Sequence, residues 1–381
     1  MWKKMRELEI YVVKQGDTLY QIARQYGVSA QQLTIENGLP NPEHLLVGQA
    51  IVIPGGEEPW GSIYVNGYAY PYIKPEVLEP ALNQCSYVTP FTYGFTPEGD
   101  LIDLDDERLR KQVLETRTRL LMHLSTLTEE GTFSNQLAVE ILTQEYLWGK
   151  LADQILVTMA EKNFSGLDVD FEYVPGEYKD AYIAFLAYMA DRMHEQGYFL
   201  ITALAPKVSD DQKGLLYESH DYYGIGAVSD YVLLMTYEWG YSYGPPMAVA
   251  PIKNVERVLN YALTNIPPEK IYMGIPFYGY DWTLPYQRGV RAPSLGNEEA
   301  LLLAVKNQSE ILFDETAQTP YFYYTDEGNR AHVVWFEDAR SINEKLKLIR
   351  DLKLIGAGIW NLMRPFPQGW LVFREQFQII R

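Results

Sequence analysis

The sequence predicts an α/β fold, in which a closed (β/α)8 TIM barrel is preceded by a small βααβ module. From residue 63 onward, short runs rich in β-branched and aromatic residues alternate with amphipathic stretches, which is typical of a parallel sheet wrapped by helices. Eight such runs are enough to close a barrel. A break rich in proline, glycine and acidic residues, Pro54–Pro59, separates them from a first segment with its own pattern.

The first segment is predicted to hold two helices between two strands. The expected elements are the strand Ile10–Lys14, the helices Leu19–Tyr26 and Ser29–Asn37, and the strand Ala50–Ile53. Asp17–Thr18 and Ser29 are suitable N-caps for the two helices. Lys and Arg balance Asp and Glu before the break, so the acidic excess behind the net charge of −18 belongs to the rest of the chain. We therefore expect domains at 1–55 and 61–381.

The second segment supplies the eight barrel strands. They are expected at Ile63–Tyr70, Tyr87–Tyr93, Arg119–Ser125, Gly166–Tyr173, Phe199–Ala205, Tyr231–Tyr237, Ile271–Phe277 and Gly356–Leu362. The helix after the fourth strand has one apolar face, made of Tyr182, Phe185, Leu186, Met189 and Met193. The stretch between the seventh and eighth strands is too long for one loop and helix. Because it contains a hairpin pattern at Tyr321–Thr325 and Ala331–Phe336, we expect an inserted α+β subdomain at about 283–336, over the barrel mouth.

Composition and charge exclude several classes of function. A chain with 47% hydrophobic and 22% charged residues is globular, and its 14% aromatic share suits sugar binding as well as core packing. The net charge of −18 argues against a nucleic-acid partner. The single cysteine excludes an internal disulfide framework, and the five histidines lack metal-site spacing, so we expect no metal or cofactor. Without a long apolar run or a signal-peptide core, we expect a monomer made in the cytosol, with no membrane partner.

Three carboxylates share one face of the fourth predicted strand. Asp168, Asp170 and Glu172 alternate with Leu167, Val169 and Phe171, so the acids lie about 6.5 Å apart on one side and the apolar residues on the other. Acids directed into a barrel repel and desolvate each other unless they form a working site. Crowding raises the pKa of the last carboxyl group, as a general acid requires, and barrel enzymes place their chemistry at this end of the strand. The alternative, an acidic edge strand with a solvated face, fits the apolar flanks poorly.

The first segment resembles a known glycan-binding module. The residues that carry the resemblance are Tyr11-Val12-Val13, Gly16-Asp17-Thr18-Leu19, Ile22-Ala23, Tyr26-Gly27-Val28, Leu33, Asn37-Gly38-Leu39, Gly48 and Ile51-Val52-Ile53-Pro54. Together they are similar to a LysM domain, over about 45 residues. The resemblance implies binding to polymers that contain N-acetylglucosamine. The alternative is a small βααβ module with no ligand.

The second segment resembles family 18 glycoside hydrolases over residues 63–381. Asp168, Asp170 and Glu172 occupy the last three acidic positions of that family's DxxDxDxE signature, whereas Ser165 replaces the first. We expect the absence of this carboxylate to change the pKa values of the site without abolishing activity, because the position lies deepest in the barrel. Met235–Trp239 resembles the family's MTYD motif, and Gly358–Trp360 its last strand, whose tryptophan forms the floor of the −1 sugar site.

The resemblance implies a substrate-assisted mechanism, which is an exception to the two-carboxylate scheme of glycosidases. Glu172 would protonate the glycosidic oxygen, and Asp170 would orient the 2-acetamido group, whose carbonyl attacks the anomeric carbon. Tyr237 would steady that carbonyl, and Asp168 would set the charge of Asp170. The implied substrate contacts are Trp360, Met235, Glu238, Trp239, Tyr70, Phe91 and Tyr278.

Some residues allow two interpretations. Gly240–Gly244 matches the G-x-S-x-G elbow of serine hydrolases, but two prolines follow where that motif needs a helix. Trp239 could stack on a sugar or pack in a lid. His123 is expected to be a barrel-mouth residue with its hydrogen bonds satisfied within the protein, in preference to a residue that contacts the substrate. Four aromatic residues end the first two strands: Tyr68, Tyr70, Phe91 and Tyr93. One of them is expected to line the −1 site, and the sequence does not indicate which one.

Three further segments narrow the resemblance. They are Asn66–Pro71, Thr96–Leu101 and Arg364–Trp370, which are similar to LysM-bearing spore cortex-lytic and spore germination N-acetylglucosaminidases. The implied activity is retaining hydrolysis of β-linked N-acetylglucosamine bonds in peptidoglycan, by a protein deposited on the spore. The alternatives are a chitinase or other endo-N-acetylglucosaminidase acting on a chitin-like polymer, and an inactive glycan-binding barrel. The presence of Glu172, Asp170 and Tyr237 favours an enzyme.

Overall fold

Eight parallel strands close into a barrel, as the sequence predicts. In the computed structural model, which describes residues 8–55, 58–128 and 132–381, the strand order is β17-β11-β10-β9-β8-β7-β4-β3, and β17 also pairs with β3. The strands are β3 (Ser62–Ala69), β4 (Tyr87–Pro90), β7 (Arg119–Ser125), β8 (Phe164–Asp170), β9 (Phe199–Leu204), β10 (Tyr231–Leu234), β11 (Ile271–Pro276) and β17 (Gly356–Trp360). Residues 1–7, which include most of the N-terminal stretch expected to lack a signal-peptide core, and residues 56–57 of the break lie outside the described residues.

Two strands that carry predicted site residues end earlier than expected. β8 ends at Asp170 and β10 at Leu234, each three residues before the predicted end. The chain then turns sharply, because Tyr173 and Glu238 adopt left-handed backbone angles, with φ of 59° and 66°. Glu172 and Tyr237 therefore sit on turns just beyond the strands, at the barrel mouth.

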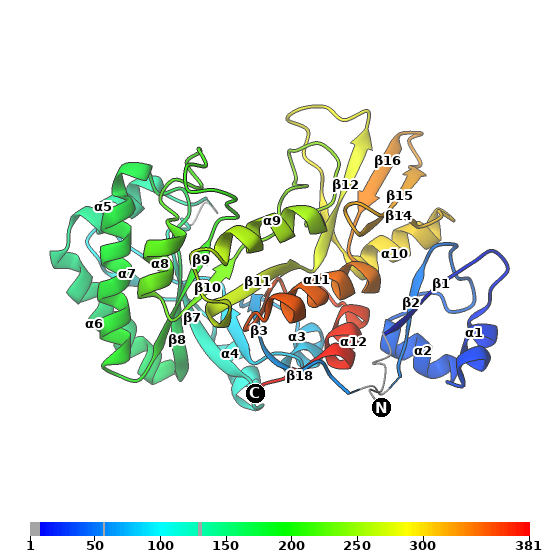
Figure 1. Ribbon diagram of the computed structural model, residues 1–381, viewed down its shortest axis with the longest axis horizontal. Coiled ribbons are helices and arrows are strands. Elements are labelled where there is room, and N and C mark those ends of the chain that lie inside the picture. Colours follow the sequence, from blue (N-terminus) through cyan, green and yellow to red (C-terminus); the bar gives the residue numbers. More distant parts are fainter. Residues whose placement is uncertain (1–7, 56–57, 129–131) are drawn as a thin grey trace.

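Helices cover the outside of the barrel (Figure 1). They are α3 (Pro75–Leu82), α4 (Glu107–Leu114), α5 (Asn135–Thr143), α6 (Tyr146–Lys162), α7 (Lys179–His194), α8 (Tyr222–Val228), α9 (Ile252–Ala262), α11 (Ala339–Leu352) and α12 (Pro367–Gln376). The predicted apolar face of α7 is buried, and Phe171 stacks against Tyr182 at 5.7 Å and against Phe185 at 5.5 Å. Packing on this outer side leaves the opposite side of β8 for the carboxylates. Short elements complete the barrel: β5 (Gly94–Phe95), β6 (Leu101–Ile102), η1 (Gly176–Tyr178), η2 (Pro268–Lys270) and β18 (Gln378–Ile379).

The stretch between β11 and β17 forms a five-stranded antiparallel sheet with one helix. Its elements are β12 (Tyr278–Leu284), β13 (Ser294–Gly296), α10 (Asn297–Lys306), β14 (Leu312–Asp314), β15 (Thr319–Thr325) and β16 (Ala331–Trp335). The predicted hairpin is confirmed, because Tyr321 pairs with Trp335 and Thr325 with Ala331. The sheet begins at Tyr278, earlier than the expected 283, because β12 continues almost directly from β11. It stands above the barrel in Figure 1.

The N-terminal module has the predicted βααβ order. Its elements are β1 (Glu9–Val12), α1 (Leu19–Tyr26), α2 (Ala30–Asn37) and β2 (Ala50–Ile53), and β1 pairs antiparallel with β2. The side chains of Thr18 and Ser29 accept hydrogen bonds from the backbones of Gln21 and Gln32, as N-caps do. The local sequence therefore determines where both helices begin.

Strand β2 is buried on both of its faces. Ile51 and Ile53 point into the module's own core with Leu33, whereas Ala50 and Val52 belong to the apolar core that the barrel helices share. The module thus packs tightly against the barrel, beside α12, instead of hanging from a linker (Figure 1).

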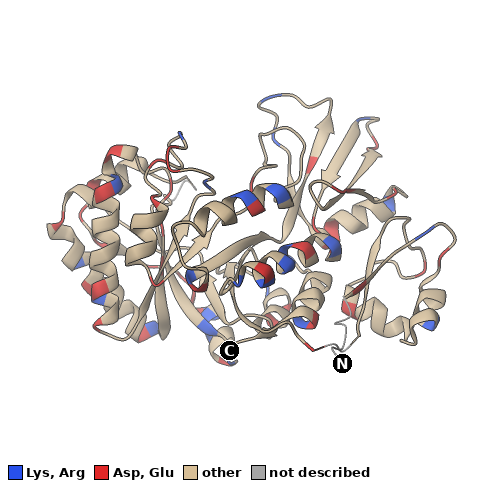
Figure 2. Ribbon diagram, viewed as in Figure 1, with Lys and Arg blue, Asp and Glu red and all other residues tan. Residues whose placement is uncertain are grey.

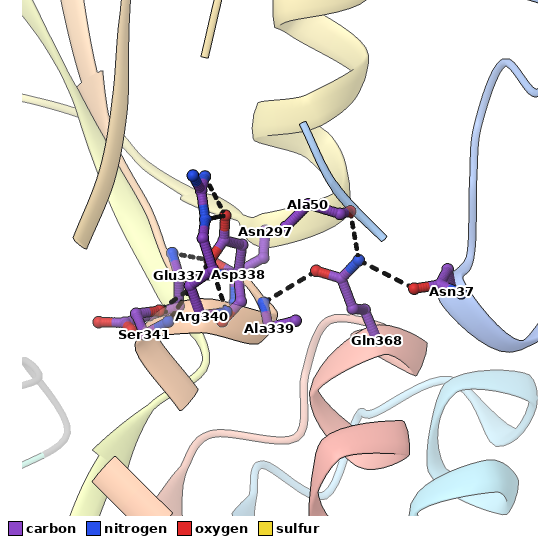
Figure 3. A network of polar contacts seen from close by, with 9 residues as sticks. All are labelled: Asn37, Ala50, Asn297, Glu337, Asp338, Ala339, Arg340, Ser341 and Gln368. Carbon is purple, nitrogen blue, oxygen red and sulfur yellow. Dashed lines mark hydrogen bonds and ion pairs between the residues drawn. The ribbon is translucent and has the colours of Figure 1, made fainter. Parts of the chain in front are cut away.

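A buried polar network crosses the same contact (Figure 3). Gln368 of α12 donates to the side chain of Asn37 at 3.1 Å and to the carbonyl of Ala50 at 2.9 Å, and it accepts from the backbone of Ala339 at 2.9 Å. Arg374 and Glu36 add an ion pair at 2.8 Å. One side chain therefore links two elements of the barrel to two elements of the module.

Replacing Gln368 with alanine should destabilise the whole protein. The change removes the hydrogen-bond partner of the buried Ala339 N–H and of the buried Ala50 carbonyl, which typically costs about 1–3 kcal/mol. Denaturant unfolding of the full chain would measure the loss. The control is Gln196→Ala, since Gln196 is exposed after α7 and its replacement should change stability by about 0.5 kcal/mol or less. Equal denaturation midpoints for both variants would show that this network does not stabilise the protein.

Charges of both signs are interspersed along α9 and α11 on the face shown in Figure 2. Among the described residues, no helix combines the length and apolar character of a membrane span.

Candidate active site

The pocket at the barrel mouth collects most of the predicted site residues. It has a volume of about 150 Å³. The side chains that line it are Tyr68, Phe91, His123, Phe133, Asp170, Glu172, Ala203, Leu233, Met235, Tyr237, Glu238 and Trp360. These residues come from seven of the barrel strands and the loops that follow them, so the closed barrel is what brings them together.

The three carboxylates occupy different depths. Asp168 lies beneath the pocket, and its carboxylate accepts a hydrogen bond from the Tyr68 hydroxyl at 2.6 Å. Asp170 and Glu172 line the pocket itself. Ser165 lies where β8 and β7 shift register, at the far end of the strand. The polar partner of Asp168 is therefore Tyr68, from a different strand.

Burial raises the pKa values of all three carboxyl groups. For Asp168, burial raises the pKa to about 8. The hydrogen bond from Tyr68 opposes this shift, and the negative charge of Asp170 adds to it. Burial also raises the pKa of Asp170. The pKa of Glu172 is raised well above its usual range by burial first, and then by the negative charges of Asp170 and Glu238. Glu172 therefore remains a proton donor at pH values where an exposed glutamate is ionised.

Aromatic rings form one wall and the floor of the pocket. Trp360 meets Phe91 edge-on with ring centroids 4.8 Å apart, and Tyr68 packs 5.8 Å from it. Tyr70 does not line the pocket and packs behind Trp360 at 6.2 Å. Tyr93 is buried below, where its hydroxyl donates to Asp106. Of the four aromatic residues left open by the sequence, Tyr68 and Phe91 are thus the two that face the cavity.

Tyr237 and Glu238 follow β10, which lies two strands along the barrel from β8. Burial raises the pKa of Tyr237 well above its usual value, so its hydroxyl is a neutral hydrogen-bond donor. Glu238 accepts hydrogen bonds from the hydroxyl groups of Tyr278 and Tyr280, the second at 2.8 Å. Tyr278 therefore reaches the pocket only through Glu238. Trp239 also lies outside the lining, with its backbone N–H bonded to Val249 and its ring against the barrel core.

His123, which was expected at the barrel mouth with its hydrogen bonds satisfied, is one of the residues that line the pocket. Its Nε2 lies 3.7 Å from Asp170, and its Nδ1 lies 2.6 Å from the Thr92 hydroxyl. Burial lowers the pKa of His123 to about 3, so the ring is neutral at ordinary pH. The available signal was strand alternation, because His123 pairs in register with Asp168 on the neighbouring strand.

The serine-hydrolase pattern does not form a nucleophile elbow. Ser242 lies in an irregular loop, and the next helix, α9, begins at Ile252. His332, the downstream histidine, pairs with Asp281 at 2.8 Å inside the inserted sheet. Among the described residues, no group of three or more His, Cys, Asp or Glu side chains could hold a metal ion.

Comparisons with known proteins match both parts of the chain. The family model described as glycosyl hydrolases family 18 matches residues 104–364, and the LysM domain model matches residues 11–54. A cortical fragment-lytic enzyme of Bacillus subtilis (strain 168) is 38% identical, with 98% of this chain and 99% of that protein covered. The crystal structure of the Bacillus megaterium QM B1551 spore cortex-lytic enzyme SleL superimposes with a TM-score of 0.93 at 35% identity, covering 97% and 98% of the two chains. A chitinase of Chromobacterium violaceum shares the fold at 23% identity and a TM-score of 0.76 over 82% of this chain and 98% of that one.

Proposed function

The chain belongs to glycosyl hydrolase family 18, and from this we propose that it is a spore cortex N-acetylglucosaminidase that hydrolyses β-linked N-acetylglucosamine bonds in peptidoglycan. Glu172 carries the proposal, because it is a carboxyl group kept protonated by burial at the wall of a pocket that also contains Asp170 and Tyr237. The names of the spore cortex-lytic relatives support the cortex as the substrate and the spore as its location.

The pocket suits a substrate-assisted reaction that retains configuration. We propose that Glu172 protonates the glycosidic oxygen while the acetamido carbonyl of the substrate attacks the anomeric carbon. Asp170 would accept a hydrogen bond from the acetamido N–H, and the neutral Tyr237 hydroxyl would donate to its carbonyl oxygen. Water would then open the oxazolinium ion, with Glu172 acting as the base.

The remaining lining residues fit supporting roles. Asp168, held by Tyr68, would set the charge of Asp170 from below. Trp360 offers a flat apolar surface for the sugar ring, and Met235, Phe91 and Glu238 complete the enclosure. The N-terminal module is proposed to bind the same wall polymer, in line with its match to the LysM domain.

Product analysis on two polymers tests this function. The full chain should release N-acetylglucosamine-ended products from spore cortex fragments, and mass spectrometry would identify them. Faster turnover of chitin oligomers than of cortex fragments would favour a chitinase instead. No turnover of either polymer, with intact binding, would identify an inactive glycan-binding barrel.

The alkaline side of the pH–rate profile should depend on Glu238. Glu172 works as an acid only while it is protonated, so anything that raises its pKa extends activity to higher pH. Glu238→Gln removes one of the two negative charges that raise the pKa of Glu172, so the alkaline limb of kcat/KM should move to lower pH. Glu327→Gln, at an exposed position of the inserted subdomain, should leave the limb in place. A shift to higher pH would contradict this coupling.

A further inference from the structure

A groove of about 740 Å³ lies between the N-terminal module and the inserted subdomain, much larger than the pocket at the barrel mouth. One wall consists of Gln15 and the loop 41–47 of the module. The other is the end of α10 and the turn after it, from Val305 to Glu310. The two parts lie side by side at the right of Figure 1, although about 260 residues separate them in sequence.

The two walls are fixed relative to each other. The backbone N–H of Ile311 donates to the carbonyl of Val47 at 2.9 Å. Gly48 approaches so closely that a Cβ there would lie 1.8 Å from the Ile311 carbonyl oxygen, so the contact requires glycine. Leu46 packs against the apolar core of the inserted subdomain. The groove is therefore preformed, and ligand binding would not need to order it.

The lining matches an uncharged, hydroxyl-rich polymer. Gln15, Asn41 and Gln308 contribute side-chain amides, each with donor and acceptor atoms, and Ser309 contributes a hydroxyl group. Leu45 and Val305 supply apolar surface between them. His44 and Glu310 complete the lining. Among the described residues neither Lys nor Arg lines the groove, and the Glu310 carboxylate repels anions, so a phosphate-rich or other strongly anionic ligand is disfavoured.

We propose that this groove is a composite site for a glycan strand bearing N-acetyl groups, half of which is built by the inserted subdomain of the barrel. The proposal rests on the proposed function, since it takes the wall polymer as the ligand. It goes beyond that function by assigning substrate contacts to Gln308 and its neighbours, which lie outside both the pocket and the module. The wall-binding element is thus not the module alone but its contact with the barrel insertion.

Gln308 offers a test with a closely matched control. Gln308 and Gln318 are both glutamines on turns of the inserted subdomain, and both have φ of 51°, so glycine suits either position. Gln308 lines the groove and Gln318 does not. Binding is measured in the full chain carrying Glu172→Gln, which prevents turnover. In this background Gln308→Gly should weaken binding to insoluble cortex and to a soluble N-acetylglucosamine hexamer. The expected loss of affinity is about 3- to 10-fold, the range for one lost hydrogen bond. Gln318→Gly should bind as the parent does.

Asn41→Ala, on the module wall, should give a loss of similar size. If Asn41→Ala weakens binding and Gln308→Gly equals its control, the module binds alone and the composite site is refuted, with the proposed hydrolysis unaffected. If neither variant weakens binding, the glycan does not use this groove. A loss on cortex without a loss on the hexamer would assign the groove to peptide stems and overturn the glycan. Turnover of cortex fragments by the unmodified chain tests the proposed function separately.

Discussion

Glu172→Gln should lower turnover of cortex fragments by about 10²- to 10⁴-fold, the usual contribution of a general acid. Glutamine keeps the size and polarity of the side chain but cannot supply the proton that the leaving oxygen requires. Binding should persist, because the other residues that line the pocket remain in place. Initial rates and equilibrium binding, measured on the same oligosaccharide, would separate the two effects.

A nearby glutamate provides the control for this variant. Glu177 lies in η1, shortly after Glu172 in the chain, and is exposed outside the pocket lining. Glu177→Gln should therefore retain the parent rate. Equal rates for Glu172→Gln and the parent protein would remove Glu172 from the role of acid.

Tyr237→Phe should lower kcat by about 10²- to 10³-fold, by analogy with the loss of one oxyanion-hole donor. The change removes a hydroxyl group that is proposed to stabilise the reacting acetamido carbonyl, and it does so where burial makes the hydrogen bond strong. A thiazoline analogue of the oxazolinium ion should inhibit the parent enzyme far more tightly than N-acetylglucosamine does, because it resembles the high-energy species. Both Tyr237→Phe and Asp170→Ala should lose most of that extra affinity, and Asp168→Ala should lose less.

Two observations would contradict this mechanism. One is a glycosyl ester trapped on Glu172 or Asp170 by a fluorosugar, since a covalent intermediate needs a protein nucleophile. The other is normal hydrolysis with no thiazoline inhibition. Tyr243→Phe is the matched control, because Tyr243 is exposed on the loop that follows Tyr237 and its hydroxyl lies outside the pocket lining.

The sequence predicted the barrel and the position of the carboxylates because both depend on local periodicity. Alternation placed Leu167, Val169 and Phe171 under the helices, where the structure has them buried. The same alternation placed Asp170 and Glu172 on the inner side, where both line the pocket. Strand ends were less predictable, since the turns at Tyr173 and Glu238 depend on backbone angles that neither residue type favours.

Local sequence patterns could not predict contacts between distant segments. Nothing around Tyr278 indicates that its hydroxyl reaches Glu238, which lies on the loop after β10. The docking of the module was also missed, although Ala50–Ile53 is a continuous apolar run and such runs are typical of strands buried on both faces. The break at Pro54–Pro59 indicates a domain boundary, but it does not indicate the contacts that Gln368 makes across that boundary.

The two-sided burial of β2 also bears on how the protein is made. The module is synthesised before the barrel, and α11 and α12, which help to cover the outer face of β2, follow the other barrel helices. At about 5–20 residues per second, Ala50 and Val52 would wait for tens of seconds before the barrel could shield them. During that interval a nascent chain exposes an apolar face of β2, and exposed apolar patches favour aggregation. Chaperone demand and the yield of recombinant protein should therefore depend on the last helix of the chain, and a product truncated before residue 367 should accumulate with its N-terminal module misfolded.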